Sequence, residues 1–260
     1  MRKDDLKELL DELYFKYNNI SFIEADPISI PHRFVAREDI EISGFLASTI
    51  AWGNRKAIVK SAARMMDMMD DSPYDFTVNA SASELEHLSR YVHRTFNGGD
   101  FITFIGALRR FYDGSIEGTL NMGQFFERSY RNSGDMRTVL SDFYKEFWNC
   151  EHEQRTRKHL SSIDKKAACK RVNMYLRWLV RKDDKGVDFG LWDIPCSALY
   201  LPLDVHTANM SRELGLLTRK QNDWKAVEEV TESLRLFDPN DPVKYDYALF
   251  GAGIDGFLKK

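Results

Sequence analysis

Apolar residues recur at the spacing of α-helices along most of the chain, and no segment of useful length alternates apolar and polar residues as a β-strand does. Residues 4–17 carry leucine or tyrosine at positions 6, 9, 10, 13 and 14, which predicts an amphipathic first helix. Residues 38–69 predict two helices broken near Trp52, and residues 245–254 predict a final core helix. The sequence therefore predicts an all-α fold.

The length of 260 residues and the 43% content of hydrophobic residues are enough for a substantial core, in one large domain or two helical lobes. The chain has no run of about 18 apolar residues, so no membrane span is expected. The charged start Met1-Arg2-Lys3-Asp4-Asp5 lacks the apolar stretch of a signal peptide. We therefore expect a cytoplasmic protein.

The charged and metal-binding residue types limit the possible functions. A net charge of −3 argues against a surface that attracts nucleic acid everywhere, although a local basic patch can coexist with an acidic total. Cys150, Cys169 and Cys196 fit neither a disulfide framework nor a zinc site, and we expect small buried side chains. The histidines and glutamates of residues 151–159 share no helix face in a ligand pattern, so no metal site is expected.

The segment around Asp204 fixes a carboxylate at the start of a helix. Pro202 keeps Leu201 extended, and the Asp204 side chain can accept a hydrogen bond from the free N–H groups of a helix beginning at Val205. Gly215 can end this helix in the left-handed conformation.

A lysine lies upstream on a second expected helix, residues 170–181. At 100° per residue, Lys170, Arg177 and Arg181 fall within about 40° of one another, whereas the apolar residues of this helix lie on the opposite arc. This pattern predicts one packed face and one basic face. A lysine and an acidic side chain are the two parts that an amine nucleophile with an acidic helper requires.

Both segments resemble parts of a known superfamily. Lys170-Arg171-Val172-Asn173-Met174-Tyr175-Leu176 resembles the lysine-bearing helix of the helix-hairpin-helix DNA glycosylases, the superfamily of endonuclease III and 8-oxoguanine glycosylase. Pro202-Leu203-Asp204-Val205-His206 resembles their Pro-Val-Asp-Thr-His element, and this resemblance extends from about residue 160 onward. The chain as a whole resembles an uncharacterised bacterial family of conserved unknown function, distantly related to these glycosylases.

The resemblance implies a two-lobed helical bundle with the active-site cleft between the lobes. The first lobe would run from about residue 35 to about residue 160. The second lobe would combine residues 1–34 with residues from about 161 to 260, and it would carry Lys170 and Asp204. It also implies a DNA repair glycosylase and AP lyase that acts on damaged duplex DNA. Lys170 would be the Schiff-base nucleophile and Asp204 the charge stabiliser.

The resemblance also bears on the substrate and on cofactors. The separation of 34 residues between Lys170 and Asp204 is similar to that in the archaeal 8-oxoguanine branch, which points to an oxidised purine. Many relatives carry a four-cysteine iron–sulfur cluster near the C-terminus, but this chain has no cysteine after Cys196, so no cofactor is expected.

Further residues are expected to contact the substrate or DNA. Residues 46–52 resemble an early glycosylase segment that ends in a residue probing the base, which makes Trp52 either a base contact or a core or hinge residue. Residues 160–167 occupy the place of the superfamily's hairpin but contain no glycine, so phosphate contacts there would come from serines and lysines. The expected binding residues are Trp52, Arg55, Lys165, Lys166, Arg171, Asn173, Arg177 and His206.

Two other functions stay open on the sequence. The chain can be a nucleic-acid-binding module that kept the fold without catalysis, or a helical interaction protein without a nucleic-acid role. In either case Asp204 is a helix cap worth about 1 kcal/mol and Lys170 is a solvated lysine.

Overall fold

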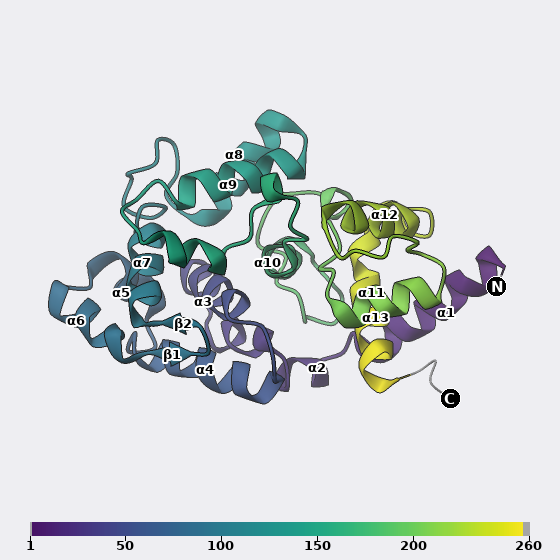
Figure 1. Cartoon of the computed structure of the whole chain (residues 1–260), viewed down its shortest axis with the longest axis horizontal. Coiled ribbons are helices and arrows are strands. Elements are labelled where there is room, and N and C mark those ends of the chain that lie inside the picture. Colours follow the sequence, from purple (N-terminus) through teal and green to yellow (C-terminus); the bar gives the residue numbers. More distant parts are fainter. Residues whose placement is uncertain (1, 257–260) are drawn as a thin grey trace. The chain divides into compact units, whose positions relative to one another are not determined.

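The computed structural model describes residues 2–256 and is predominantly helical (Figure 1), which confirms the predicted all-α class. The described residues also contain one small hairpin, in which β1 (Val92–His93) pairs antiparallel with β2 (Phe96–Asn97). None of the helices in residues 2–256 has the length and apolar composition needed to span a lipid bilayer.

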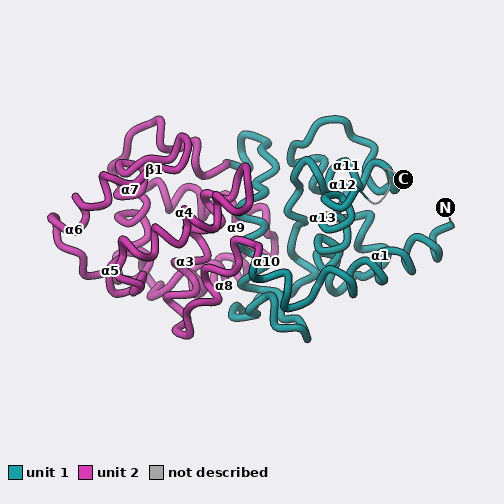
Figure 2. The backbone as a smooth tube through the Cα atoms, turned by 90° about the horizontal axis from the view of Figure 1, so that it is seen from below, with its two compact units in different colours: residues 1–24, 162–260 teal, residues 25–161 magenta. Residues whose placement is uncertain are grey.

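The chain divides into two compact units (Figure 2). Unit 1 comprises residues 1–24 and 162–260, and unit 2 comprises residues 25–161. The lobes expected from the sequence had their limits at about residues 35 and 160.

Unit 2 surrounds a core of aromatic side chains. The Phe45 ring lies 6.1 Å from Phe104 and 5.6 Å from Phe143, centroid to centroid, and all three rings are buried. Besides the hairpin, its elements are η1 (Pro27–Ser29), η2 (Pro31–Arg33), α3 (Arg37–Thr49), α4 (Arg55–Asp67), α5 (Pro73–Asn79), α6 (Ala82–His87), η3 (Leu88–Arg90), α7 (Gly98–Arg109), α8 (Met122–Ser133), α9 (Met136–Phe147) and η4 (Gln154–His159).

Unit 1 is built around the C-terminal helix α13 (Tyr245–Asp255), which packs against both α1 (Lys3–Tyr17) and α11 (Val205–Glu213). Gly251 allows the close approach of α1, because a Cβ atom there would lie 2.3 Å from the Tyr17 ring. The other elements of unit 1 are α2 (Ser21–Glu24), η5 (Ile163–Lys165), α10 (Lys170–Val180), η6 (Cys196–Ala198), α12 (Trp224–Arg235) and η7 (Pro242–Lys244).

Several expected helix limits are confirmed. The first helix runs over Lys3–Tyr17, and the break near Trp52 separates α3 from α4. Helix α7 is capped by Asn97. Asp100 completes a capping box: its carboxylate accepts a hydrogen bond from the Asn97 N–H at 3.0 Å, and the Asn97 side chain accepts one from the Asp100 N–H at 3.1 Å.

The cysteines are less uniform than predicted. Cys169 is buried as expected, whereas Cys150 and Cys196 are partly exposed.

Candidate active site

The N-termini of two helices of unit 1 bring a lysine and an aspartate together. Lys170 is the first residue of α10, and Asp204 caps α11. The Lys170 Nζ lies 4.0 Å from the Asp204 Oδ2, and the two side chains are 26% and 21% exposed, respectively. The pair is therefore a close contact of opposite charges that small molecules can reach from solvent.

Local sequence explains how Asp204 is held. Asp204 is extended, with φ −110° and ψ −172°, and its Oδ1 accepts a hydrogen bond from the Thr207 N–H at 2.9 Å. Its other carboxylate oxygen faces Lys170. Gly215 adopts φ 74° just after the helix, so both the predicted start and the predicted end of α11 are confirmed.

The prediction of a solvent-facing basic side on α10 is wrong. Arg177 and Arg181 are only 3% and 2% exposed, because carboxylates from other segments of unit 1 cover them. Arg177 donates to Asp188 at 3.3 Å and to Asp246, so this arginine, expected at the DNA, lies inside unit 1. Only the first residue of the supposed face, Lys170, keeps partial access to solvent.

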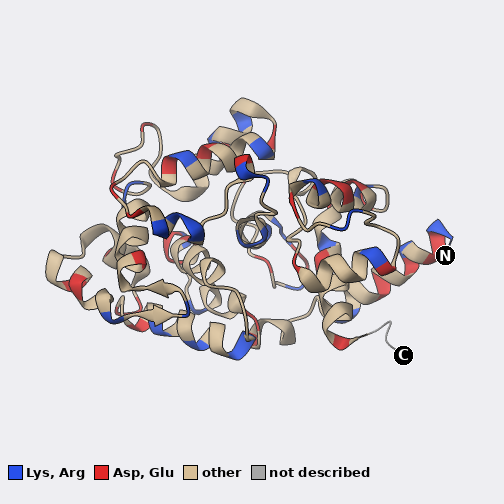
Figure 3. Cartoon of the chain, in the orientation of Figure 1, with Lys and Arg blue, Asp and Glu red and all other residues tan. Residues whose placement is uncertain are grey.

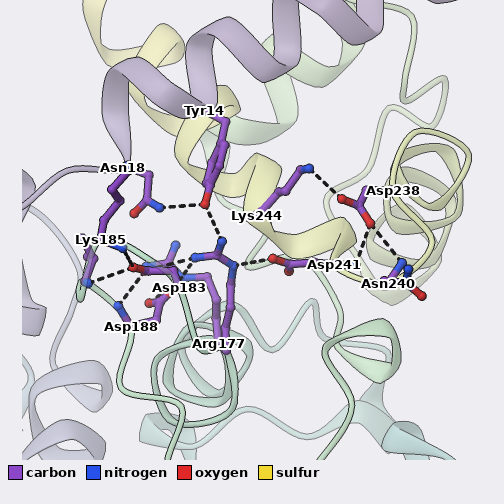
Figure 4. A network of polar contacts seen from close by, with 12 residues as sticks. Tyr14, Asn18, Arg177, Asp183, Lys185, Asp188, Asp238, Asn240, Asp241 and Lys244 are labelled. Carbon is purple, nitrogen blue, oxygen red and sulfur yellow. Dashed lines mark hydrogen bonds and ion pairs between the residues drawn. The ribbon is translucent and has the colours of Figure 1, made fainter.

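Arg181 is the centre of a buried network of polar contacts, whose members Tyr14, Asp183, Asp188 and Asp241 are labelled in Figure 4. Its guanidinium donates to Asp188 at 3.0 Å, Asp183 at 3.2 Å, Asp241 at 2.8 Å and the Tyr14 hydroxyl at 2.7 Å. Although burial opposes the charge, Asp188 and Asp241 hold the pKa of Arg181 above its usual value. This network joins α1, α10 and the segment before α13.

Asp246 is a charged residue near the pair that the sequence analysis missed. It lies on α13, is 6% exposed and bonds Arg177. Burial and, to a smaller extent, the charge of Asp204 raise the pKa of Asp246 to about 6, against the lowering effect of Arg177. The signal in the sequence was a single carboxylate early in an otherwise apolar helix, Tyr245-Asp246-Tyr247-Ala248-Leu249.

Unfolding experiments can test the direction in which the pKa of Asp246 is shifted. Because the folded-state pKa of Asp246 is raised from 3.8 to about 6, its contribution to stability is complete below pH of about 4 and is lost as the pH rises through about 6. The free energy of unfolding of the wild type minus that of Asp246→Asn is expected to fall by about 2 kcal/mol between pH 4 and 7 in urea titrations.

Asp223→Asn is the matched control, since Asp223 caps α12 and asparagine caps as well. The hydrogen bond from Arg219 lowers the pKa of Asp223 to about 2, so its contribution is lost only as the pH falls below about 4. The free energy of unfolding of the wild type minus that of Asp223→Asn should not change between pH 5 and 7. If the corresponding free-energy difference for Asp246→Asn were also independent of pH, it would contradict the raised pKa of Asp246.

The other expected residues of unit 1 have different surroundings. Asn173 is buried and donates to the Ala168 carbonyl at 3.2 Å, which places it away from solvent. Arg171 is partly buried, and burial lowers the pKa of its guanidinium to about 10. His206 is exposed in the first turn of α11, with its ring centroid 6.4 Å from that of Phe250.

The glycine-free segment before α10 still makes a tight turn. Lys165 and Lys166 are exposed, and Lys166 adopts φ 61°, the left-handed conformation that glycine favours. The Lys166 carbonyl accepts a hydrogen bond from the Trp224 N–H at 3.0 Å, which ties the turn to the start of α12.

Trp52 and Arg55 belong to unit 2. The half-buried Trp52 ring stacks on His159 at 6.0 Å and meets His93 edge-on at 5.1 Å. Arg55 opens α4 and lies 4.0 Å from the Asp26 carboxylate.

Part of the polar run of residues 151–159 is buried. His159 is buried, with its Nε2 3.2 Å from Asp100 Oδ2. Within residues 2–256, no group of three or more histidine, cysteine, aspartate or glutamate side chains is arranged to hold a metal ion.

Comparison with known proteins gives one match. The model of DUF2400, a family described as a protein of unknown function, matches residues 26–255, which is most of the chain. No curated protein matches the chain, and no solved structure matches it.

Proposed function

The chain belongs to the DUF2400 family, whose function is unknown, and we propose that it is a DNA repair glycosylase with AP-lyase activity. Lys170 acts as the nucleophile and Asp204 stabilises positive charge. The substrate is a damaged base in duplex DNA, such as an oxidised purine.

The observation that carries the proposal is the approach of Lys170 to Asp204. Their charged atoms are 4.0 Å apart, although 34 residues separate them in the chain. Both side chains are about a quarter exposed, so an extruded nucleotide can reach the amine and the carboxylate together. The resemblance of residues 170–176 and 202–206 to the glycosylase elements supports the same two roles.

The chemistry follows from these two groups. Lys170 first loses a proton to water, and its neutral amine attacks C1′ while the bond from C1′ to the base breaks. The base leaves with that electron pair and takes up a proton from water. Positive charge on the sugar is greatest as the bond breaks, and a carboxylate beside it lowers the barrier. Asp204 is held for this role because its Oδ1 is engaged by the Thr207 N–H while Oδ2 faces the amine.

The lyase step uses the same nitrogen. The attached amine loses its proton, the bond between C1′ and O4′ breaks, and O4′ takes up a proton, which leaves a Schiff base between Nζ and C1′. Loss of a proton from C2′ then expels the 3′ phosphate and nicks the strand. Water finally releases the sugar and restores Lys170.

Borohydride trapping tests the proposal. Duplexes carrying an abasic site, 8-oxoguanine or uracil are incubated with the wild type, Lys170→Ala and Lys225→Ala, where Lys225 is an exposed lysine of unit 1. We expect a covalent adduct with the wild type and with Lys225→Ala, and none with Lys170→Ala, because reduction traps only the Schiff base. No adduct with any duplex, or an equal adduct with Lys170→Ala, would overturn the proposal.

A further inference from the structure

We propose that the exposed face of α4 and the neighbouring segment 90–94 of unit 2 binds the phosphate backbone of duplex DNA. Five exposed cations form this face, which we call the basic surface: Lys56, Lys60, Arg64, Arg90 and Arg94. The choice of DNA rests on the proposed function, whereas the surface itself does not involve Lys170 or Asp204.

Three of the cations form a row along α4. Lys56, Lys60 and Arg64 are each four residues apart, so they lie on one side of the helix and span about 12 Å. The opposite side of α4 is buried through Ile58 and Ala62. Helix packing therefore directs the whole row to solvent.

The other two cations are held beside this row by contacts between α4 and the hairpin (Figure 1). The Arg64 Nη2 donates to the Arg90 carbonyl at 3.3 Å, and the Tyr91 hydroxyl donates to the Ser61 carbonyl at 3.1 Å. At the far end, the Arg94 guanidinium lies against Gly53, where a Cβ atom would be 2.4 Å from Arg94 Nη2. Segment 90–94 thus runs along α4 from Arg64 to Gly53.

Little negative charge lies on these segments: α4 carries one carboxylate, Asp67 in its last position, which lies 3.9 Å from Arg33. Residues 53–66 and 88–99 contain no aspartate or glutamate, although the whole chain has a net charge of −3. Within residues 2–256, none of the five cations forms an ion pair with a carboxylate, whereas the adjacent Arg55 faces Asp26 and is therefore left out of the surface. Lysine and arginine positions, coloured blue, recur along the α4 ribbon in Figure 3. Clustered cations without carboxylate partners repel one another, and a bound polyanion relieves this repulsion.

Arg94 adds an independent observation. It adopts φ 55° in the two-residue turn between β1 and β2, where glycine or asparagine is favoured and a long side chain costs energy. Strained residues of this kind concentrate at functional sites. Gly53, itself at φ 100°, leaves the space that the guanidinium occupies.

A polyanion with evenly spaced charges fits this surface better than a membrane does. Val92 is the one large apolar side chain that the segment 90–94 exposes, at 60%, which gives little apolar area to insert into lipid. Lysines and arginines one helical turn apart can instead each meet a backbone phosphate.

Fluorescence anisotropy with an undamaged duplex tests the inference. The triple variant Lys56→Gln, Lys60→Gln, Arg64→Gln is compared with the wild type and with Arg131→Gln, Lys145→Gln, Lys158→Gln, which removes three exposed cations elsewhere in unit 2. We expect the slope of log affinity against log salt to become shallower by about 2.7 in the first variant, with binding at least about tenfold weaker at low salt, and no change in the second.

Equal losses in the two variants, or unchanged binding in the first, would overturn the inference. So would tight binding of duplex RNA or of acidic phospholipid vesicles with none of duplex DNA. Failure of the proposed function would give a different result. Binding of the duplex would then still depend on the basic surface, but the wild type would form no adduct in borohydride trapping. Conversely, if the wild type formed the adduct but its binding of the duplex did not depend on salt, the proposed function would stand and the inference about the basic surface would fall.

Discussion

Replacing Arg181 by methionine is expected to lower the free energy of unfolding by about 3–5 kcal/mol, because it leaves buried carboxylates without their cation. The side chains of Asp183 and Asp188 are 0% exposed, and both bond the Arg181 guanidinium. Asp241 would lose its 2.8 Å contact as well. Methionine fills a similar volume, so the loss reports the missing charge and hydrogen bonds more than a cavity.

Urea unfolding at neutral pH measures this effect. Arg2→Met is the control, since Arg2 pairs with Asp5 at 2.8 Å on the surface and is 85% exposed, and its replacement should leave the unfolding curve unchanged within error. Arg181→Lys should fall between the two, because an ammonium keeps the charge but cannot bond four partners in one plane. A loss below about 1 kcal/mol for Arg181→Met would mean that the carboxylates find water or protons at little cost.

The burial of Arg181 also shows where sequence reasoning stops. Periodicity placed Lys170, Arg177 and Arg181 on one side of a helix, and α10 ends one residue before Arg181. Periodicity also cannot tell whether that side meets solvent or other chain segments. The partners come from outside the helix: Asp188 lies in the segment that follows α10, and Asp241 and Asp246 lie 60 and 69 residues downstream of Arg181 and Arg177, respectively. An arginine covered by carboxylates and one in water have the same helical pattern.

Local signals were more reliable. Asp204 and Gly215 set the limits of α11 because capping and left-handed termination involve only neighbouring residues. The 4.0 Å approach of Lys170 to Asp204 is different in kind, since it depends on how two helices of unit 1 pack. No spacing rule predicted that distance, and the expectation that the two side chains act together came from their chemical types and from the resemblance. The basic surface was missed because it needs the hairpin to lie beside α4.

Asp204→Asn is expected to slow base release by about 10²–10³-fold in single-turnover assays, because the amide cannot stabilise positive charge on the sugar. Asparagine caps a helix about as well as aspartate, so α11 and the melting temperature should be nearly unchanged. The variant should still be trapped on a preformed abasic site, because the attack of Lys170 there does not require departure of a base.

Asp204→Ala separates the two roles of this carboxylate. It should lose the same activity and, in addition, about 1 kcal/mol of stability, because the Thr207 N–H loses its acceptor. If Asp204→Asn released the base at the wild-type rate, Asp204 would be a helix cap only, and its 4.0 Å contact with Lys170 would be an ordinary ion pair. If both variants slowed base release equally while only alanine lowered stability, the carboxylate charge itself would be what the reaction uses.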